Sequence, residues 1–169
     1  MRVGELLADG FDRVREVVHE VADGLDPDLL TRRPGPDANP IGWLLWHLTR
    51  VQDDHLAAAE GTGQAWTADG WAQRFALPYD DAAIGYGQSS EEVGAFAVPS
   101  AALLVGYADA VHARSRAYVA QLSEDDLDRV VDPSYDPPVT LAVRLVSVLS
   151  DTLQHAGQAA YVSGLLERA

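Results

Sequence analysis

The sequence predicts an all-α protein, a four-helix bundle with one long, partly helical connection. Apolar residues recur at helical spacing over four stretches, at about residues 4–25, 40–60, 100–122 and 140–168. Apolar and polar residues alternate over no more than a few positions, so the sequence predicts no long strand. A chain of 169 residues can bury one substantial core, and we therefore expect a single domain over residues 1–169. An antiparallel bundle is the simplest packing for these helices.

The first two helices have clear boundaries in the sequence. The first is ended by Pro27, which cannot continue a helix cheaply and disfavours helical backbone at the residue before it. The second begins at Asn39-Pro40, where an N-cap residue is followed by a proline suited to the first helical position. It is predicted to end near Glu60, before Gly-Thr-Gly.

The connection over residues 61–99 is the least regular part of the chain. Its aromatic residues are scattered among Gly, Pro and Asp: Trp66, Trp71, Phe75, Tyr79 and Tyr86. Residues 89–92, Ser-Ser-Glu-Glu, match a capping box at the start of a short helix. The connection is far longer than ordinary loops, so we expect short helices in it and a role in packing or function.

The second half of the chain repeats these boundary signals. Ser100 follows Pro99 and is a suitable N-cap for the third long helix. Ser123 precedes three acidic residues and caps another short helix, and Thr140 caps the last long helix.

Composition excludes several classes of function. The chain has 12 Lys+Arg, all of them arginine, against 26 Asp+Glu, for a net charge of −14. Nucleic acids and anionic membranes need a basic footprint, so we expect neither as a partner. The chain has no cysteine, and therefore no disulfide, no thiolate metal site and no catalytic thiol of its own. Without a signal peptide or an apolar run of about 20 residues, we expect a cytoplasmic protein.

Polar residues with metal-binding side chains lie on the core faces of two helices. Asp151 and His155 are four residues apart on a stripe that is otherwise apolar: Leu141, Leu145, Val148, Ala159, Val162 and Leu166. His47 lies on the stripe of the second helix: Trp43, Leu44, Val51 and Ala58. Because a buried charge needs a counter-charge or a metal, the sequence predicts one metal site between these helices.

Two imidazoles and one carboxylate suit zinc, nickel, iron(II) or manganese. Three protein ligands leave a coordination position open, which is the pattern of catalytic rather than structural sites. A metal there would acidify a bound water or thiol, or polarise a carbonyl. The alternative is that these are core-facing polar residues satisfied by hydrogen bonds, with Asp151 and His155 simply paired along their helix.

Two residues near His47 are secondary candidates. Asp54 lies seven residues further on, near the same face, where it either supports the metal ligands, faces substrate or is a solvated acid. His55 lies off that face and is either a residue at the rim of the site or a surface histidine.

The last helix carries two more candidates. Arg144, two turns before Asp151, either binds an anionic substrate or neutralises Asp151 or a carboxylate of another helix. Gln158 follows His155 by three residues and either orients that ligand or makes an ordinary hydrogen bond between helices.

Two segments resemble the DinB-like superfamily of four-helix metalloproteins. They are N-P-I-G-W-L-L-W-H-L-T-R-V-Q-D-D-H-L at residues 39–56 and D-T-L-Q-H-A-G-Q at residues 151–158. The branch they resemble most includes mycothiol-dependent maleylpyruvate isomerase. The resemblance implies a metal held by His47 on the second helix and by Asp151 and His155 on the last. Family members usually have Glu or His where this chain has Asp151, whose side chain is one methylene shorter than Glu.

The resemblance also implies a function: a metal-dependent transferase or isomerase that uses a low-molecular-weight thiol of mycothiol type and a small electrophilic substrate. The nucleophile would be a metal-bound thiol or water, and zinc is the leading metal, with nickel and iron as alternatives. Two other hypotheses remain open. One is a non-catalytic metal- or small-molecule-binding protein of the stress response, and the other is a non-haem iron(II) oxygenase. A homodimer is a further hypothesis, in which the small residues of the stretch 57–63 would pack against a partner.

Overall fold

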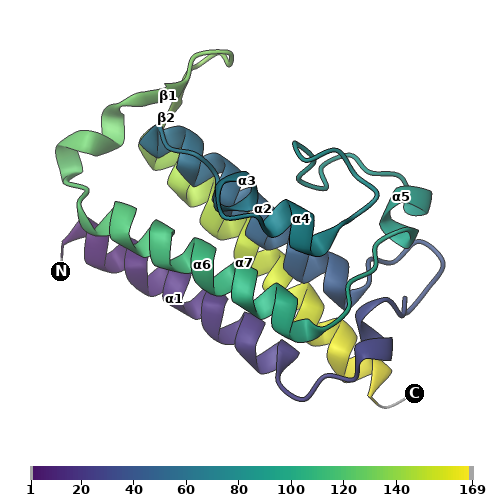
Figure 1. Cartoon of the computed structure of the whole chain (residues 1–169). Helices are drawn as coiled ribbons and strands as arrows, with labels where there is room; N and C mark the ends of the chain where they lie inside the picture. The colour runs from purple at the N-terminus through teal and green to yellow at the C-terminus, as the bar shows by residue number, and fades with distance from the viewer. Residues whose placement is uncertain (1, 168–169) are drawn as a thin grey trace.

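The computed structural model describes residues 2–167, and four long helices form its bundle (Figure 1). They are α1 (Val3–Ala22), α2 (Ile41–Glu60), α6 (Ala101–Ala120) and α7 (Leu141–Leu166). The helix α2 packs along α7, and α1 packs along α6. The predicted all-α, four-helix fold is confirmed; the predicted end of the last helix, Arg168, lies outside the described residues.

Short elements decorate the bundle. The connection from α2 to α6 contains the predicted short helices: α3 (Ala65–Ala68), α4 (Trp71–Phe75) and α5 (Ser90–Gly94). Two single-turn 3₁₀ helices, η1 (Pro27–Leu30) and η2 (Glu124–Asp128), lie elsewhere. A short antiparallel pair, β1 (Val130–Asp132) and β2 (Val139–Thr140), precedes α7. The sequence did not predict this pair, because strands of two or three residues are too short to show alternation.

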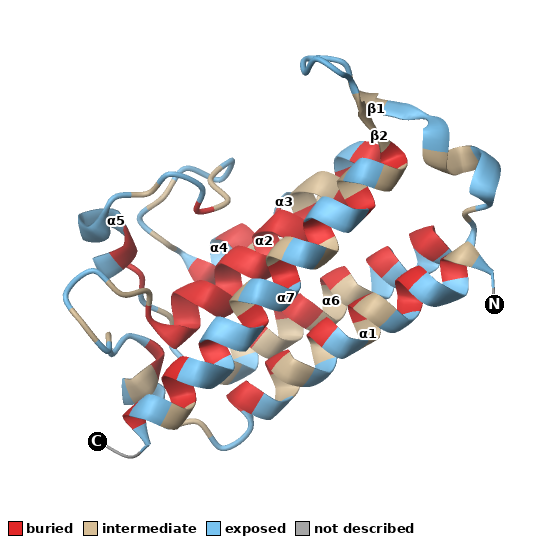
Figure 2. Ribbon diagram, turned by 180° about the vertical axis from the view of Figure 1, so that it is seen from behind, coloured by how far each residue is buried: buried red, intermediate tan, exposed pale blue. Residues whose placement is uncertain are grey.

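The helix α2 is enclosed on nearly all sides. Every residue from Ile41 to Asp53 is buried, including the polar side chains of Arg50, Gln52 and Asp53. Figure 2 shows α2 as a mostly red helix beside α7. Because α7 and α6 can cover only part of a helix, the rest of α2 needs another cover, and the long connection supplies it. This explains why that connection is so long.

Aromatic packing holds the connection on the bundle. The ring centroids of Trp66 lie 5.1 Å from Phe75 and 5.2 Å from Tyr107 of α6. On the other side, Trp46 of α2 lies 5.9 Å from Phe96. Such spacings are typical of favourable aromatic pairs, so the connection is part of the core. Within residues 2–167, no helix combines the length and apolar character needed to cross a bilayer.

The start of α2 allows a test of this packing. A Cβ atom at Gly42 would lie 2.8 Å from the carbonyl oxygen of Leu30 and 2.8 Å from the Phe96 ring. We expect Gly42→Ala to lower the free energy of unfolding by about 1–3 kcal/mol, because backbone and a buried ring must move. Urea denaturation measures this change.

Gly157 of α7 is the matched control, because no other segment of the described chain comes within 4 Å of a Cβ built there. Gly157→Ala is expected to raise the free energy of unfolding by about 0.5–1 kcal/mol through helix propensity. Equal effects of the two substitutions would contradict close packing at Gly42.

Candidate metal centre

Three of the predicted site residues meet between α2 and α7. His47, Asp151 and His155 each offer one ligand atom, and these atoms lie within 4.8 Å of one another. The imidazole rings of His47 and His155 meet edge to face, with centroids 4.7 Å apart. The packing of α2 along α7 therefore brings together the side chains that helical periodicity placed on the two core faces.

His47 is buried and held from two sides. Trp43 stacks on its ring at a centroid distance of 4.7 Å, and its Nδ1 is hydrogen-bonded to the carbonyl oxygen of Ile84 in the connection. Because a carbonyl oxygen only accepts, Nδ1 carries the proton and Nε2 keeps a free lone pair. Burial lowers the pKa of His47, which favours the neutral ring that metals bind.

His155 is oriented in the same way from its own helix. Its Nδ1 lies 2.8 Å from Oε1 of Gln158, which accepts the Nδ1 proton. Its Nε2 lies 3.6 Å from Oδ1 of Asp151. Both histidines thus use Nδ1 for a hydrogen bond and keep Nε2 as the nitrogen able to bind a metal, an arrangement typical of metal-binding histidines.

Asp151 provides the test of whether a metal fits. Its Oδ2 is buried, and no group among residues 2–167 donates a hydrogen bond to it. A buried carboxylate oxygen without a donor is costly. The pair with His155 does not remove this cost, because 3.6 Å exceeds hydrogen-bond length and involves the other oxygen. With both imidazoles neutral, the cluster is anionic, and the residues present fit a divalent cation.

Asp54 and His55 lie outside this cluster. Oδ1 of Asp54 accepts a hydrogen bond from Nε2 of Gln64 at 2.7 Å, so this carboxylate binds the start of the connection. Its Oδ2 lies 3.4 Å from Nδ1 of His55. Burial and the nearby Arg144 lower the pKa of His55, so its ring is more readily neutral than a free histidine.

Arg144 pairs with a carboxylate, but not with Asp151 or with a carboxylate of another helix, which were the predicted partners. Its guanidinium donates to Oδ2 of Asp132 in β1 at 3.0 Å, and it also lies 3.2 Å from Nδ1 of His55. The carboxylate it binds thus belongs to the β1–β2 pair rather than to Asp151.

Sequence reasoning missed the residues of α2 that bind the connection. Trp43 donates from Nε1 to Gln88 at 2.8 Å, and Arg50 donates from Nε to the carbonyl oxygen of Ala83 at 3.2 Å. Asp53 accepts hydrogen bonds from the backbone of residues 65 and 66, each at 2.8 Å. A signal was present in the spacing for Trp43 and Arg50, because both share one face of a helix with His47.

The connection touches His47 at a residue that must be glycine. Gly85 has φ +92°, and a Cβ atom there would lie 2.6 Å from Nδ1 of His47 and 3.0 Å from Trp43. Side chains are disfavoured by this backbone conformation, and here they also lack space. The backbone of the connection therefore lies directly against the candidate ligand.

Fold and site together define a class of protein: a helical bundle with a candidate metal centre built from facing helices. The sequence profile of the DinB superfamily matches residues 10–159, and the chain belongs to this superfamily. The crystal structure of a conserved protein from Enterococcus faecalis is similar to it over the whole chain. The TM-score is 0.92 and the identity 31%, covering 100% of this chain and 99% of the other. A search of curated proteins found no match.

The contact at Gly85 leads to a prediction. Gly85→Ala and Gly87→Ala both place a side chain on left-handed backbone, at an expected cost of about 1–2 kcal/mol each. Only Gly85→Ala also overlaps His47, so we expect it to destabilise the fold further and to change the NMR signals of the His47 ring.

Gly87 is the matched control, because no atom of the described residues beyond its chain neighbours lies within 4 Å of a Cβ built there. Urea denaturation and imidazole NMR of both variants measure the difference. The close contact would be disproved by an unchanged His47 ring in Gly85→Ala.

Proposed function

We propose that the protein is a metal-dependent enzyme whose metal is held by His47, Asp151 and His155. The observation that carries this proposal is the buried Oδ2 of Asp151, which has no hydrogen-bond donor in residues 2–167, beside two imidazoles with free Nε2 atoms. Three ligands leave a coordination position for a substrate or water. Zinc is the leading metal, because imidazole and carboxylate ligands in this number are common at catalytic zinc sites. Nickel and iron(II) accept the same ligands.

The proposed cosubstrate is a low-molecular-weight thiol. Its support is the resemblance of residues 39–56 and 151–158 to the superfamily branch with mycothiol-dependent maleylpyruvate isomerase, together with the absence of cysteine from the chain. A divalent metal in this site would lower the pKa of a bound thiol and so supply a thiolate near neutral pH. The sulfur would then attack a small electrophile, in a transferase with departure of a leaving group and in an isomerase with later elimination of the thiol.

The chain's own residues prepare the site for this chemistry. Ile84 and Gln158 accept the Nδ1 protons of the two histidines and so keep both Nε2 atoms available. Trp43 covers one face of His47 and shields that ligand from water. The side chain of Asp151 is 36% exposed and that of His155 20% exposed, so we expect a small molecule to approach the cluster from the α7 side.

Metal content is the first prediction of this proposal. We expect about one equivalent of a transition metal in protein incubated with zinc and then desalted. His47→Ala and His155→Ala should each lose it, because two ligands hold a divalent ion far more weakly than three. Asp151→Asn should also lose it, because the amide keeps the shape but removes the charge. Elemental analysis by plasma mass spectrometry measures the content.

His19→Ala and His112→Ala are the matched controls. These histidines bind Asp109 and Asp12 between α1 and α6, away from the cluster, and the variants should retain the metal. A wild-type protein that takes up no zinc, nickel or iron(II) would refute the proposed metal centre.

Thiol dependence is the second prediction. The zinc-loaded protein, given mycothiol or glutathione and an aryl halide or maleylpyruvate, should consume the electrophile faster than the thiol alone. His155→Ala should return the rate to that background, because the thiolate is no longer supplied at neutral pH. Chromatography of substrate and product over time measures the rate.

Electrophile consumption that is equal with and without protein would instead favour a non-catalytic metal-binding protein. Activity that requires iron(II) and oxygen but no thiol would favour an oxygenase.

A further inference from the structure

We propose that Arg50 is a positioning residue for the candidate metal centre. Through the backbone of residues 81–84, it keeps Nδ1 of His47 protonated and Nε2 free for a metal. The consequence for metal binding rests on the proposed function, whereas the consequence for the His47 ring does not.

Arg50 is a charged side chain with no exposed surface. Burying a guanidinium is expensive unless its N–H groups find acceptors. Its acceptors lie mainly in the connection: the carbonyl oxygen of Ala83 at 3.2 Å, that of Asp81 at 3.5 Å and Oε1 of Gln64 at 2.9 Å. Oδ2 of Asp53 lies 3.8 Å away. The buried cation is therefore bound chiefly to backbone and side-chain oxygens of the connection.

These contacts lie next to the one that holds His47. Arg50 follows His47 by three residues on α2, and Ala83 directly precedes Ile84. Two consecutive carbonyl groups are thus bound by side chains from neighbouring turns of one helix. The contact of Arg50 with residue 83 fixes where the carbonyl of residue 84 points.

The segment that carries Ile84 has no regular structure of its own. Residues 76–89, between α4 and α5, form turns and bends. A segment without a helical or strand ladder is held by its tertiary contacts, and here these include the side chains of Trp43, His47 and Arg50. Removing the Arg50 contacts therefore frees the Ile84 carbonyl to move.

The chemical consequence concerns the His47 tautomer. A neutral imidazole carries its proton on either nitrogen, and the acceptor bound to one nitrogen decides which. With Ile84 in place, Nδ1 carries the proton. If this carbonyl moves, a share of the molecules carries the proton on Nε2, which then cannot bind a metal.

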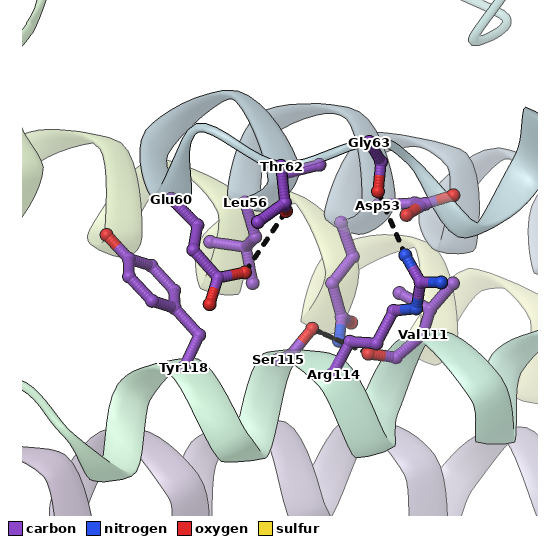
Figure 3. Close-up of a pocket in the computed structure, with 11 residues that line it drawn as sticks. Asp53, Leu56, Glu60, Thr62, Gly63, Val111, Arg114, Ser115 and Tyr118 are labelled. Atoms are coloured by element: carbon purple, nitrogen blue, oxygen red, sulfur yellow. Dashed lines mark hydrogen bonds between the residues drawn. The ribbon is translucent and has the colours of Figure 1, made fainter. Parts of the chain in front are cut away.

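Arg114 provides the matched control. From α6 it donates to the carbonyl oxygen of Gly63 at 2.9 Å and to Asp69 at 2.9 Å. Figure 3 shows its guanidinium reaching Gly63 beside a small cavity between α2 and α6. Arg114 thus fastens the same connection, but at its first residues rather than beside Ile84.

The test compares Arg50→Met with Arg114→Met. Two-bond ¹H–¹⁵N NMR of the metal-free protein, at a pH where the rings are neutral, reports which nitrogen of His47 is protonated. We expect the Nδ1–H form in the wild type and in Arg114→Met, and a mixture of both forms in Arg50→Met. Zinc affinity, measured against a competing chelator, should fall about tenfold to a hundredfold in Arg50→Met and stay unchanged in Arg114→Met.

A folded Arg50→Met with the wild-type tautomer would overturn the proposal, as would equal effects of the two variants. If Arg50→Met does not fold, Arg50→Lys decides, because a lysine keeps the charge but cannot reach all of these acceptors. Its His47 should show a partial change of tautomer, and an unchanged ring would again overturn the proposal. If the wild type binds no zinc, the proposed function fails, and the NMR comparison still decides the role of Arg50.

Discussion

The structure depends on the imidazole of His47, which contacts the long connection on one side and α7 on the other. Nδ1 of His47 binds the carbonyl oxygen of Ile84, and the rest of its ring meets His155 and Asp151 on α7. The first contact fastens the long connection to α2, and the second joins α2 to α7. Because α2 is buried over residues 41–53, the connection cannot leave without exposing a core helix. The contact that holds the connection on α2 is therefore also the one that orients the candidate ligand.

Two carboxylate groups differ in how completely their buried oxygens are hydrogen-bonded. Asp53 is buried and fully satisfied: it accepts two backbone N–H groups of the connection and the hydroxyl of Tyr107. Burial and the charge of Asp53 raise the pKa of Tyr107 well above its usual value, so that hydroxyl stays a donor. Asp151 has one buried oxygen that receives no hydrogen bond from residues 2–167. Because buried carboxylate oxygens are normally hydrogen-bonded, as those of Asp53 are, the Oδ2 of Asp151, which receives no such bond from the described residues, is the place where a cation is expected.

The shorter side chain of Asp151 does not keep it from its neighbours. Where the resemblance leads one to expect Glu or His, the aspartate still brings an oxygen within 4.8 Å of both histidine ligand atoms. Membership of the DinB superfamily and a similar solved structure establish the fold, whereas the proposed chemistry depends on these three side chains and on their neighbours.

The sequence by itself determined the helices and the core faces on which His47, Asp151 and His155 lie, because helical periodicity alone places residues on a face. The packing of α2 along α7 then brought the three side chains together. The contact between Gln158 and His155 follows from the same spacing. Only the tertiary structure decided which acceptors hold His47 and Arg50, and which carboxylate Arg144 neutralises. These acceptors are mostly backbone carbonyls or residues distant along the chain, such as those at 81, 83 and 84. Every residue has the same backbone carbonyl group, so residue types do not predict which carbonyl will accept a hydrogen bond from a given side chain. The packing of the connection against α2 determines which carbonyl groups become the acceptors.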